Sequence, residues 1–272
     1  MFNSVKTSML MALLMALVIG VFWYMGGESY GLVGVVLGLL MNFGLFWFSD
    51  RIILSMTGAK EVDKMQFPQL HAIVERLAFK AQIPKPKVYV VENSSLNAFA
   101  TGRSPSHAAV VVYSGLLKQM SEQEVESVLG HELSHVKNRD TLISTLAAVI
   151  AGSLSYFMYA FMFGGRSRDD RNPLGLVVVV LAPLAAMLIR LAISRSREYA
   201  ADEGGAKLSN PLALASALEK IETSVERHPW RDGNPSTAHL YIINPFTGDG
   251  LFSLFSTHPP VKERIRRLRS MH

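Results

Sequence analysis

The stretch Gly130-His131-Glu132-Leu133-Ser134-His135 places two imidazoles four residues apart, with a carboxylate directly after the first. Residues four apart lie on the same face of an α-helix, so His131 and His135 can hold one metal ion from a single rigid element. Glu132 lies about 100° around the helix from His131, so it does not ligate the same ion. It can instead take a proton from a water in the fourth position of a tetrahedral zinc site. The motif therefore predicts a catalytic zinc site.

The residues before this motif predict that it lies on a helix. Ser121-Glu122-Gln123-Glu124 has the pattern of a capping box, with Ser121 as the N-cap. Apolar residues then recur at helical spacing, at Val125, Val128, Leu129, Leu133 and Val136. The alternative is an amphipathic helix that carries two histidines by chance, and a third metal ligand is needed to exclude it.

The third ligand is expected in Arg197-Glu198-Tyr199-Ala200-Ala201-Asp202. The chain has no cysteine, so histidine, glutamate and aspartate are the residues left to bind zinc. Glu198 and Asp202 share a helix face, and we assign Glu198 as the third zinc ligand. Asp202 is then placed to accept a hydrogen bond from the free ring nitrogen of one ligand histidine. The alternative is a solvated acidic face that follows an arginine cluster.

Two apolar runs near the N-terminus, Met9–Met25 and Gly31–Phe48, predict a transmembrane hairpin over residues 1–49. Hydrophobic residues make up 49% of the chain and the mean hydropathy is +0.23. The five-residue break between the runs holds only Glu28, whereas basic residues lie outside both runs, which places both ends in the cytosol. Aromatic residues mark the boundaries of the runs, as in membrane aromatic belts: Trp23, Tyr24, Tyr30 and Trp47. A cleaved signal peptide is the alternative, but the first run is longer than a usual signal-peptide core.

A second membrane hairpin is expected within residues 141–193, from the apolar runs Thr141–Phe163 and Leu174–Ile189. Its connecting loop carries three arginines, which the positive-inside rule disfavours on the outer face, so a hairpin lying in or on the membrane is the alternative. Either arrangement returns the chain to the cytoplasmic side. There, residues 50–140 and 194–272 would form the two parts of one domain that contains the metal site.

The positive charge of the chain does not by itself indicate a nucleic-acid partner. The net charge is +5 and the isoelectric point is near 9.4. The basic residues lie beside apolar segments and in a short C-terminal helix that contains Arg264, Arg266, Arg267 and Arg269. Contact with the surface of a lipid bilayer explains this distribution better. The sequence also contains no glycine-rich phosphate loop and no serine or cysteine nucleophile motif.

The segment before the metal motif predicts a small sheet. Pro68–Ala81 has the pattern of a helix, and Val88–Val91 and Ala108–Tyr113 have that of strands. Between the strands, the uncharged stretch 97–102 could be an exposed sheet edge that pairs with an extended peptide. An ordinary turn or a buried strand explains it equally well. Near the C-terminus, His258 either begins the last helix or donates to an oxyanion, and the residues alone favour the first role.

With these segments placed, the chain resembles the HtpX family of bacterial membrane zinc metalloproteases, which are relatives of the eukaryotic CAAX prenyl protease. The resemblance rests on four motifs, NAFATG at 97–102, GHELSHVKNRD at 130–140, REYAAD at 197–202 and STHPP at 256–260. It implies one Zn²⁺ per chain, held by His131, His135 and Glu198, with Glu132 as the catalytic base. It also implies roles for five further residues, Asn97 and His258 as transition-state stabilisers and Ala98, Phe99 and Ala100 as a strand that pairs with substrate.

We therefore expect a mainly helical α+β membrane protein, in which a zincin-like protease domain with a small sheet is combined with two transmembrane helical hairpins. The resemblance implies an endopeptidase for damaged or misfolded membrane proteins in protein quality control and the stress response. It would lie in the bacterial inner membrane, with both termini and the protease domain in the cytoplasm. The expected partners are protein or peptide substrates and the bilayer, and a second copy of the chain or other quality-control proteases are further candidates. An intramembrane metalloprotease and a non-catalytic zinc-binding scaffold are the alternatives.

Overall fold

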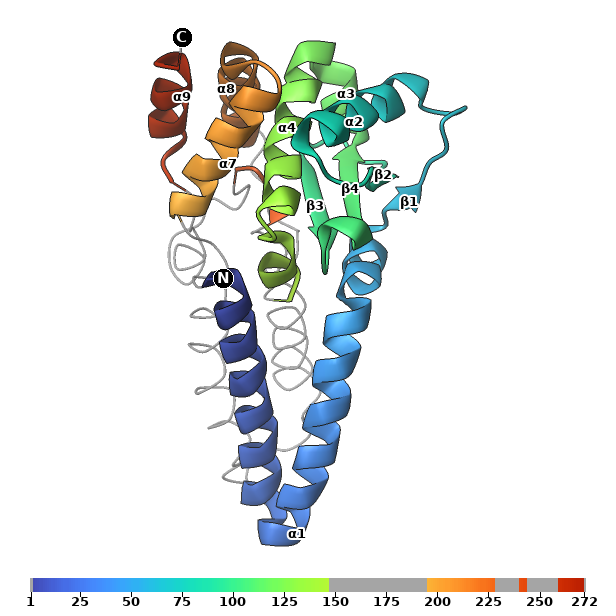
Figure 1. Ribbon diagram of the computed structural model, residues 1–272, viewed down its shortest axis with the longest axis vertical. Helices are drawn as coiled ribbons and strands as arrows, with labels where there is room; N and C mark the ends of the chain where they lie inside the picture. Colours follow the sequence, from blue (N-terminus) through green and yellow to red (C-terminus); the bar gives the residue numbers. More distant parts are fainter. Residues whose placement is uncertain (1, 147–194, 228–239, 244–258, 272) are drawn as a thin grey trace.

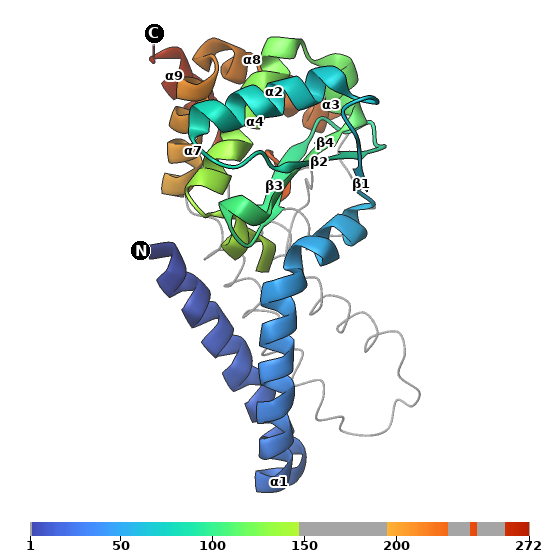
Figure 2. The same ribbon diagram turned by 45° about the vertical axis from the view of Figure 1, so that its right-hand side comes forward.

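The computed structural model describes residues 2–146, 195–227, 240–243 and 259–271. These residues form a mostly helical fold with one four-stranded sheet, and two long helical arms extend from one end of it (Figures 1 and 2). The expected combination of a helical domain with a small sheet is thus confirmed. The second hairpin, expected within 141–193, lies almost wholly outside the described residues, so the number of hairpins stays a prediction.

Helix α1 (Phe2–Thr57) consists of two arms that run in opposite directions and meet at Gly26 and Gly27 (Figure 1). Gly27 has a φ of +69°, in the left-handed region where glycine meets no steric penalty, so the chain can reverse there. The second arm, Gly26–Thr57, is the one helix in the described part of the chain that is both long and apolar enough to cross a membrane. The first arm contains a shorter apolar helix, Thr7–Gly20.

The second arm is longer than the sequence pattern indicates. The expected boundary between residues 49 and 50 lies inside the helix, which continues to Thr57. Ile53 is fully buried in a hydrophobic cluster with Phe99 and Val111, so the last turns of the arm pack against the sheet. Within the five-residue break between the two apolar runs, only Gly26 and Gly27 leave the helical conformation.

The sheet is mixed, in the order β1-β2-β4-β3, and consists of β1 (Lys60–Glu61), β2 (Lys87–Val91), β3 (Ala98–Gly102) and β4 (Ala108–Tyr113). Strands β2 and β4 are parallel, whereas β1 pairs antiparallel with β2 and β3 pairs antiparallel with β4. The two strands predicted from the sequence are confirmed as β2 and β4. The uncharged stretch between them forms β3, at one edge of the sheet.

Side chains of β4 alternate between two hydrophobic clusters, as the pleat of a strand requires. Val110 and Val112 belong to the larger cluster, which includes residues of α2 and α4, whereas Val111 and Tyr113 belong to the smaller one beside α1. The remaining helices are α2 (Pro68–Ala81), α3 (Ser114–Gln119), α4 (Glu122–Lys137), α7 (Arg195–Leu208), α8 (Pro211–Arg227) and α9 (Val261–Arg269). Helix α4 lies between β3 and α7, and so the metal motif is near the middle of the domain (Figure 1).

Candidate metal centre

Helix α4 begins with the capping box that the sequence predicts. The hydroxyl of Ser121 accepts from the backbone N–H of Glu124 at 3.4 Å, and the Glu124 carboxylate accepts from the backbone N–H of Ser121 at 2.8 Å. The same carboxylate accepts from Ser216 and Lys220 of α8, each at 2.7 Å. Burial alone would raise the pKa of Glu124, but the bonds from Lys220, Ser121 and Ser216 lower it to about 2. This carboxylate therefore ties the start of α4 to α8.

The three residues predicted to bind the metal converge between α4 and α7. The rings of His131 and His135 have centroids 4.8 Å apart. The carboxylate of Glu198 approaches both rings, with Oε2 3.8 Å from Nε2 of His131 and Oε1 3.5 Å from Nε2 of His135. One ligand atom from each residue lies within 4.8 Å of the others, so the three could hold a metal ion.

Glycine permits the close approach of the two helices. A Cβ on Gly205 of α7 would lie only 2.7 Å from the backbone nitrogen of His131. Real Cβ atoms do not approach backbone this closely, and a larger residue would therefore push α7 away from α4. The distance between Glu198 and the two histidines depends on this contact.

The outer nitrogen of each histidine lies against a carboxylate. Nδ1 of His131 is 3.0 Å from Oδ1 of Asp202, and Nδ1 of His135 is 3.1 Å from Oδ2 of Asp140. In each ring Nε2 is left for a metal, which is the arrangement that histidine ligands of metals usually have. Burial alone would lower the pKa of His135, but Asp140, Glu198 and Glu132 raise it to about 9. A group of carboxylates that stabilises this positive charge also suits a divalent cation, so the residues present fit a zinc ion.

Arg264 of α9 is part of the same cluster, which the sequence analysis missed. Its side chain is fully buried, not at a membrane surface as expected. Nε and one terminal nitrogen donate to the two oxygens of Asp202 at 2.8 and 2.7 Å, and the other terminal nitrogen lies 3.7 Å from Glu198. These contacts strongly lower the pKa of Asp202 although burial opposes that shift. The sequence does contain a signal for the burial of Arg264, since at helical spacing this residue shares a face with the apolar residues Val261 and Leu268.

Glu132 lies on the side of α4 that faces β3. Its Oε2 accepts from the backbone N–H of Ala100 at 3.0 Å. The side chain is 7% exposed, and burial raises its pKa, although His131 and His135 partly oppose the shift. The sheet edge and the predicted base are therefore in direct contact.

Asn97 precedes β3 and is buried, with its amide group bonded to a distant backbone segment. Its Oδ1 accepts from the N–H of Ile242 at 3.2 Å, and its Nδ2 donates to the carbonyl of Leu240 at 3.4 Å. Arg264 donates to the carbonyl of Ile242 at 3.2 Å, so the same segment is held from both sides. His258, the other predicted transition-state stabiliser, lies outside the described residues.

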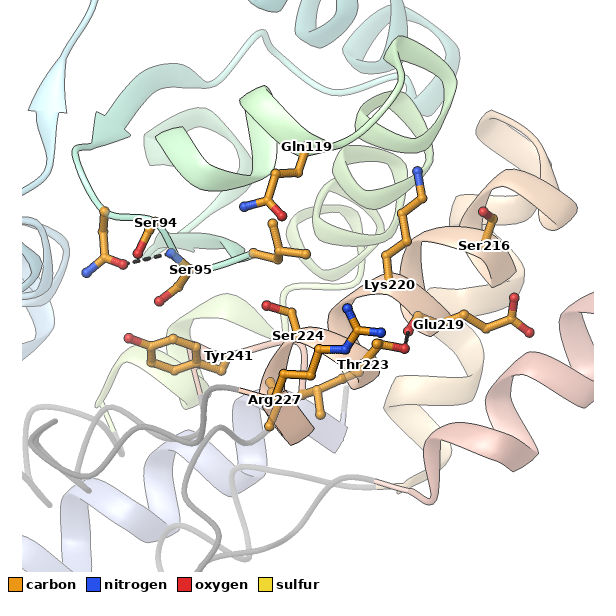
Figure 3. Close-up of a pocket in the computed structure, with 14 residues that line it drawn as sticks. Ser94, Ser95, Gln119, Ser216, Glu219, Lys220, Thr223, Ser224, Arg227 and Tyr241 are labelled. Atoms are coloured by element: carbon orange, nitrogen blue, oxygen red, sulfur yellow. Dashed lines mark hydrogen bonds between the residues drawn. The ribbon is translucent and has the colours of Figure 1, made fainter.

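A separate polar pocket of about 890 Å³ lies between the chain that enters β3 and helix α8 (Figure 3). Its walls carry hydroxyl and amide groups, three apolar side chains, two basic residues and one acidic residue, the charged ones being Lys220, Arg227 and Glu219. The side chains of Gln119 and Tyr241 are also at its edge (Figure 3). The three candidate metal ligands are not among its described lining residues, so the pocket is distinct from the metal centre.

The family model and the curated relatives agree on one group of proteins, and a solved structure adds a similar fold. A model of peptidase family M48 matches residues 64–272. A protein named "Protease HtpX homolog" from Pyrococcus furiosus is 50% identical over 275 residues, which cover 98% of this chain and 95% of the relative. Another of that name, from Methylibium petroleiphilum, is 48% identical over 278 residues, covering 100% and 98%. The crystal structure of Ste24p from S. mikatae has a similar fold, with a TM-score of 0.53 and 19% identity. The match covers 98% of this chain and 65% of that one, so this chain spans about two thirds of that structure's length.

Proposed function

Because the chain belongs to peptidase family M48, and is therefore a metallopeptidase, we propose that it is a membrane-bound zinc endopeptidase acting on damaged or misfolded membrane proteins at the cytoplasmic side. The observation that carries this proposal is the convergence of two histidine Nε2 atoms and the Glu198 carboxylate beside Glu132. Each histidine is backed by its own carboxylate, which is an arrangement suited to a reactive metal and not needed for a packing role.

The metal is proposed to be one zinc ion, held by His131, His135 and Glu198. When bound, zinc would act as a Lewis acid on the scissile carbonyl and lower the pKa of the attacking water. Three protein ligands leave a tetrahedral ion with one open position, as in catalytic zinc sites and unlike closed structural ones. This donor set therefore favours the enzyme over the zinc-binding scaffold.

Glu132 is proposed as the general base and then the general acid. Its carboxylate takes a proton from the water as the oxygen attacks the carbonyl carbon, and it returns that proton to the nitrogen as the C–N bond breaks. Asn97 and His258 remain proposed stabilisers of the oxyanion. For Asn97 this role requires release of its bonds to Leu240 and Ile242.

Strand β3 is proposed to pair with the substrate. The backbone N–H of Tyr113 donates to the carbonyl of Asn97 at 3.0 Å. Along an antiparallel ladder, residues that bond to the neighbouring strand alternate with residues that do not. The amide groups of Ala98 and Ala100 therefore face away from β4. These outward groups lie on the same side as Glu132, to which Ala100 donates. Ala98, Phe99 and Ala100 are buried, so pairing with a peptide requires a rearrangement that exposes this edge of the sheet.

The experiment that tests this function compares three forms of the detergent-purified protein for zinc content and casein cleavage. The parent should contain one zinc per chain and cleave casein. Glu132→Gln should keep its zinc and lose on the order of 10²–10⁴-fold in cleavage rate. Glu198→Ala should lose both zinc and activity. Cleavage at the parent rate by the Glu132 variant would show that the base is a different residue.

A further inference from the structure

The two ends of β3 lie in different surroundings. At the Gly102 end, the next residue, Arg103, stacks over the ring of Trp47 at 4.5 Å and donates to the Trp47 carbonyl at 3.5 Å. The carbonyl of Gly102 also accepts from the hydroxyl of Thr141 at 2.9 Å. This end of the strand is therefore fixed to the second arm of α1.

Trp47 marks the level at which the second arm would leave a membrane. An α-helix rises 1.5 Å per residue, so Trp47 lies about 30 Å beyond Gly27, which equals the thickness of a bilayer's hydrocarbon core. The first charged residues after Glu28 are Asp50 and Arg51, one turn past Trp47. Apolar side chains of the arm are exposed between these levels, at Leu32, Val33, Val36, Leu37, Leu39, Leu40, Met41 and Phe43.

The other end of β3 leads away from this level. The chain before Ala98 passes through Ser94, Ser95 and Leu96, which line the polar pocket together with Lys220 and Arg227 of α8 (Figure 3). Besides its apolar residues, the pocket is lined by hydroxyl, amide and charged groups of both signs, Lys220, Arg227 and Glu219, and these groups suit water and hydrophilic peptide. The strand thus runs from an aqueous region at Ala98 toward the bilayer surface at Arg103.

The catalytic position lies a short, fixed distance from that surface. Ala100 donates to Glu132, and it is three residues from Arg103, about 10 Å along an extended strand. A peptide that pairs with the outward edge of β3 would therefore have its scissile bond above the level of Trp47 by about 10 Å of strand together with the reach of the Arg103 side chain. Antiparallel pairing is the more stable arrangement per residue, and it directs the N-terminal side of the peptide toward Arg103 and the bilayer.

On this basis we propose that the enzyme selects segments that follow a transmembrane helix of the substrate, and cuts about three to six residues after the helix leaves the bilayer. Segments that precede a transmembrane helix would have to pair in the parallel direction, and they are disfavoured. The inference rests on the proposed function, because it assumes that Glu132 acts at β3 and that α1 spans the membrane.

The test uses the full-length protein reconstituted in liposomes with single-span reporter proteins. One reporter series carries a fixed cleavable sequence 4, 10 or 20 residues after its span, on the face where the protease domain lies. A matched series carries the same sequence at the same distances before the span. The soluble peptide alone is the third substrate, and Glu132→Gln is the blank for all of them.

We expect the reporter cut 4 residues after its span to be cleaved at least tenfold faster than either the 20-residue reporter or the matched reporter cut before the span. Equal rates for the two series at 4 residues would overturn the proposed direction, and equal rates at all distances would overturn the fixed distance. In both cases the proposed function would still hold if the parent cleaves the reporters and the Glu132→Gln variant does not. Absence of cleavage of all reporters and of the soluble peptide would overturn both proposals.

A pair of variants tests one contact that helps to set the distance. Arg103→Gln removes the stacking on Trp47, which joins the end of β3 to α1 in addition to the packing of Ile53 on Phe99, whereas Arg51→Gln removes a similar contact, 5.7 Å from the ring of Phe48, that does not involve the sheet. With a reporter that repeats the cleavable sequence at successive positions, Arg103→Gln should spread the cuts over more positions, with the total rate within a factor of three. Arg51→Gln should keep the parent distribution. A parent-like distribution in Arg103→Gln would contradict the role of this contact.

Discussion

The two histidines of the metal centre are supported in contrasting ways. His131 is backed by Asp202, which in turn forms a two-point ion pair with the fully buried Arg264 of α9. His135 is backed by Asp140, which lies shortly after the end of α4 and has a cation, Arg197, at the longer distance of 3.7 Å. The first support joins α4, α7 and α9 through a two-point ion pair, whereas the second joins the end of α4 to α7 only through the longer contact between Asp140 and Arg197.

This difference allows metal affinity and the stability of the fold to be changed separately. Support through Arg264 links metal binding to the folding of the C-terminal helices, because breaking it leaves a charge buried. Support through Asp140 mainly orients one ring. Variants on the two sides should therefore lower metal affinity by comparable factors, but only those on the Arg264 side should greatly lower the stability of the fold.

The largest effect is expected for Arg264→Met. Removing one partner of a buried ion pair costs about 3–5 kcal/mol, since Asp202 is left without its counter-charge. Thermal unfolding of the detergent-purified protein would measure this loss. Arg266→Met is the matched control on the same helix, because Arg266 forms an exposed pair with Glu263 and such pairs contribute about 0–1 kcal/mol.

Equal unfolding temperatures for the two arginine variants would mean that Arg264 does not neutralise Asp202. If Arg264→Met fails to fold, the double variant with Asp202→Asn provides a second route. Removing both charges should recover part of the lost stability, because the two positions belong to one network and their effects are not additive.

A smaller effect is expected for Asp202→Asn. An asparagine keeps the shape of the side chain but removes the charge that faces both His131 and Arg264. Zinc affinity should fall about 10–100-fold, which competition with a chelator would measure. The unfolding temperature of the metal-free protein should fall as well, because Arg264 is left as an unpaired buried charge. An unchanged zinc affinity would show that Asp202 has no role in orienting His131.

Asp140→Asn should lower zinc affinity by a similar factor with less loss of stability. Asp140 is in contact with His135, and its cation is more distant than the one that neutralises Asp202. The measurements are again chelator competition and thermal unfolding of the metal-free form. A loss of stability as large as that of Asp202→Asn would mean that the two sides are equivalent and that the comparison is wrong.

Short-range spacing explains what the sequence predicted well. The capping box at Ser121, the helical face with His131 and His135, and strands β2 and β4 depend on residues close in sequence, where helix and strand periodicity is a strong signal. Glu198 was assigned from its pattern with Asp202 and from the chemical need for a carboxylate. The structure brings it to the two histidines across a segment that the periodicity does not position.

The long-range contacts could not be predicted from local patterns. Arg264 and Asp202 are 62 residues apart, and an arginine in a basic helix is more often exposed than buried. The bonds from Asn97 to Leu240 and Ile242 span more than 140 residues and use backbone groups, which leave no mark in the sequence. Asp140 was within a recognised motif, but its role depends on a turn at Arg139, which has a φ of +58°.

The smallest expected effect concerns the opposite end of α4, where Glu124 is held by Lys220, Ser121 and Ser216. Its pKa is about 2 in the folded protein and near 4.5 when unpaired, so its contribution is complete above about pH 5 and is lost as the pH falls toward 2. Lys220 is partly exposed, which limits the effect to about 1–2 kcal/mol. In Glu124→Gln the unfolding temperature should therefore be lower than the parent's at pH 7, and the difference should shrink between pH 5 and pH 3.

The control is Glu122→Gln, because Glu122 lies in the same turn but is exposed. Its unfolding temperature should follow the parent's at every pH. If the difference in unfolding temperature between the parent and Glu124→Gln stays constant with pH, the stability comes from the shape of the cap and not from its charge. Ionised carboxylates would then matter at the metal-binding end of α4 but not at its N-terminal end.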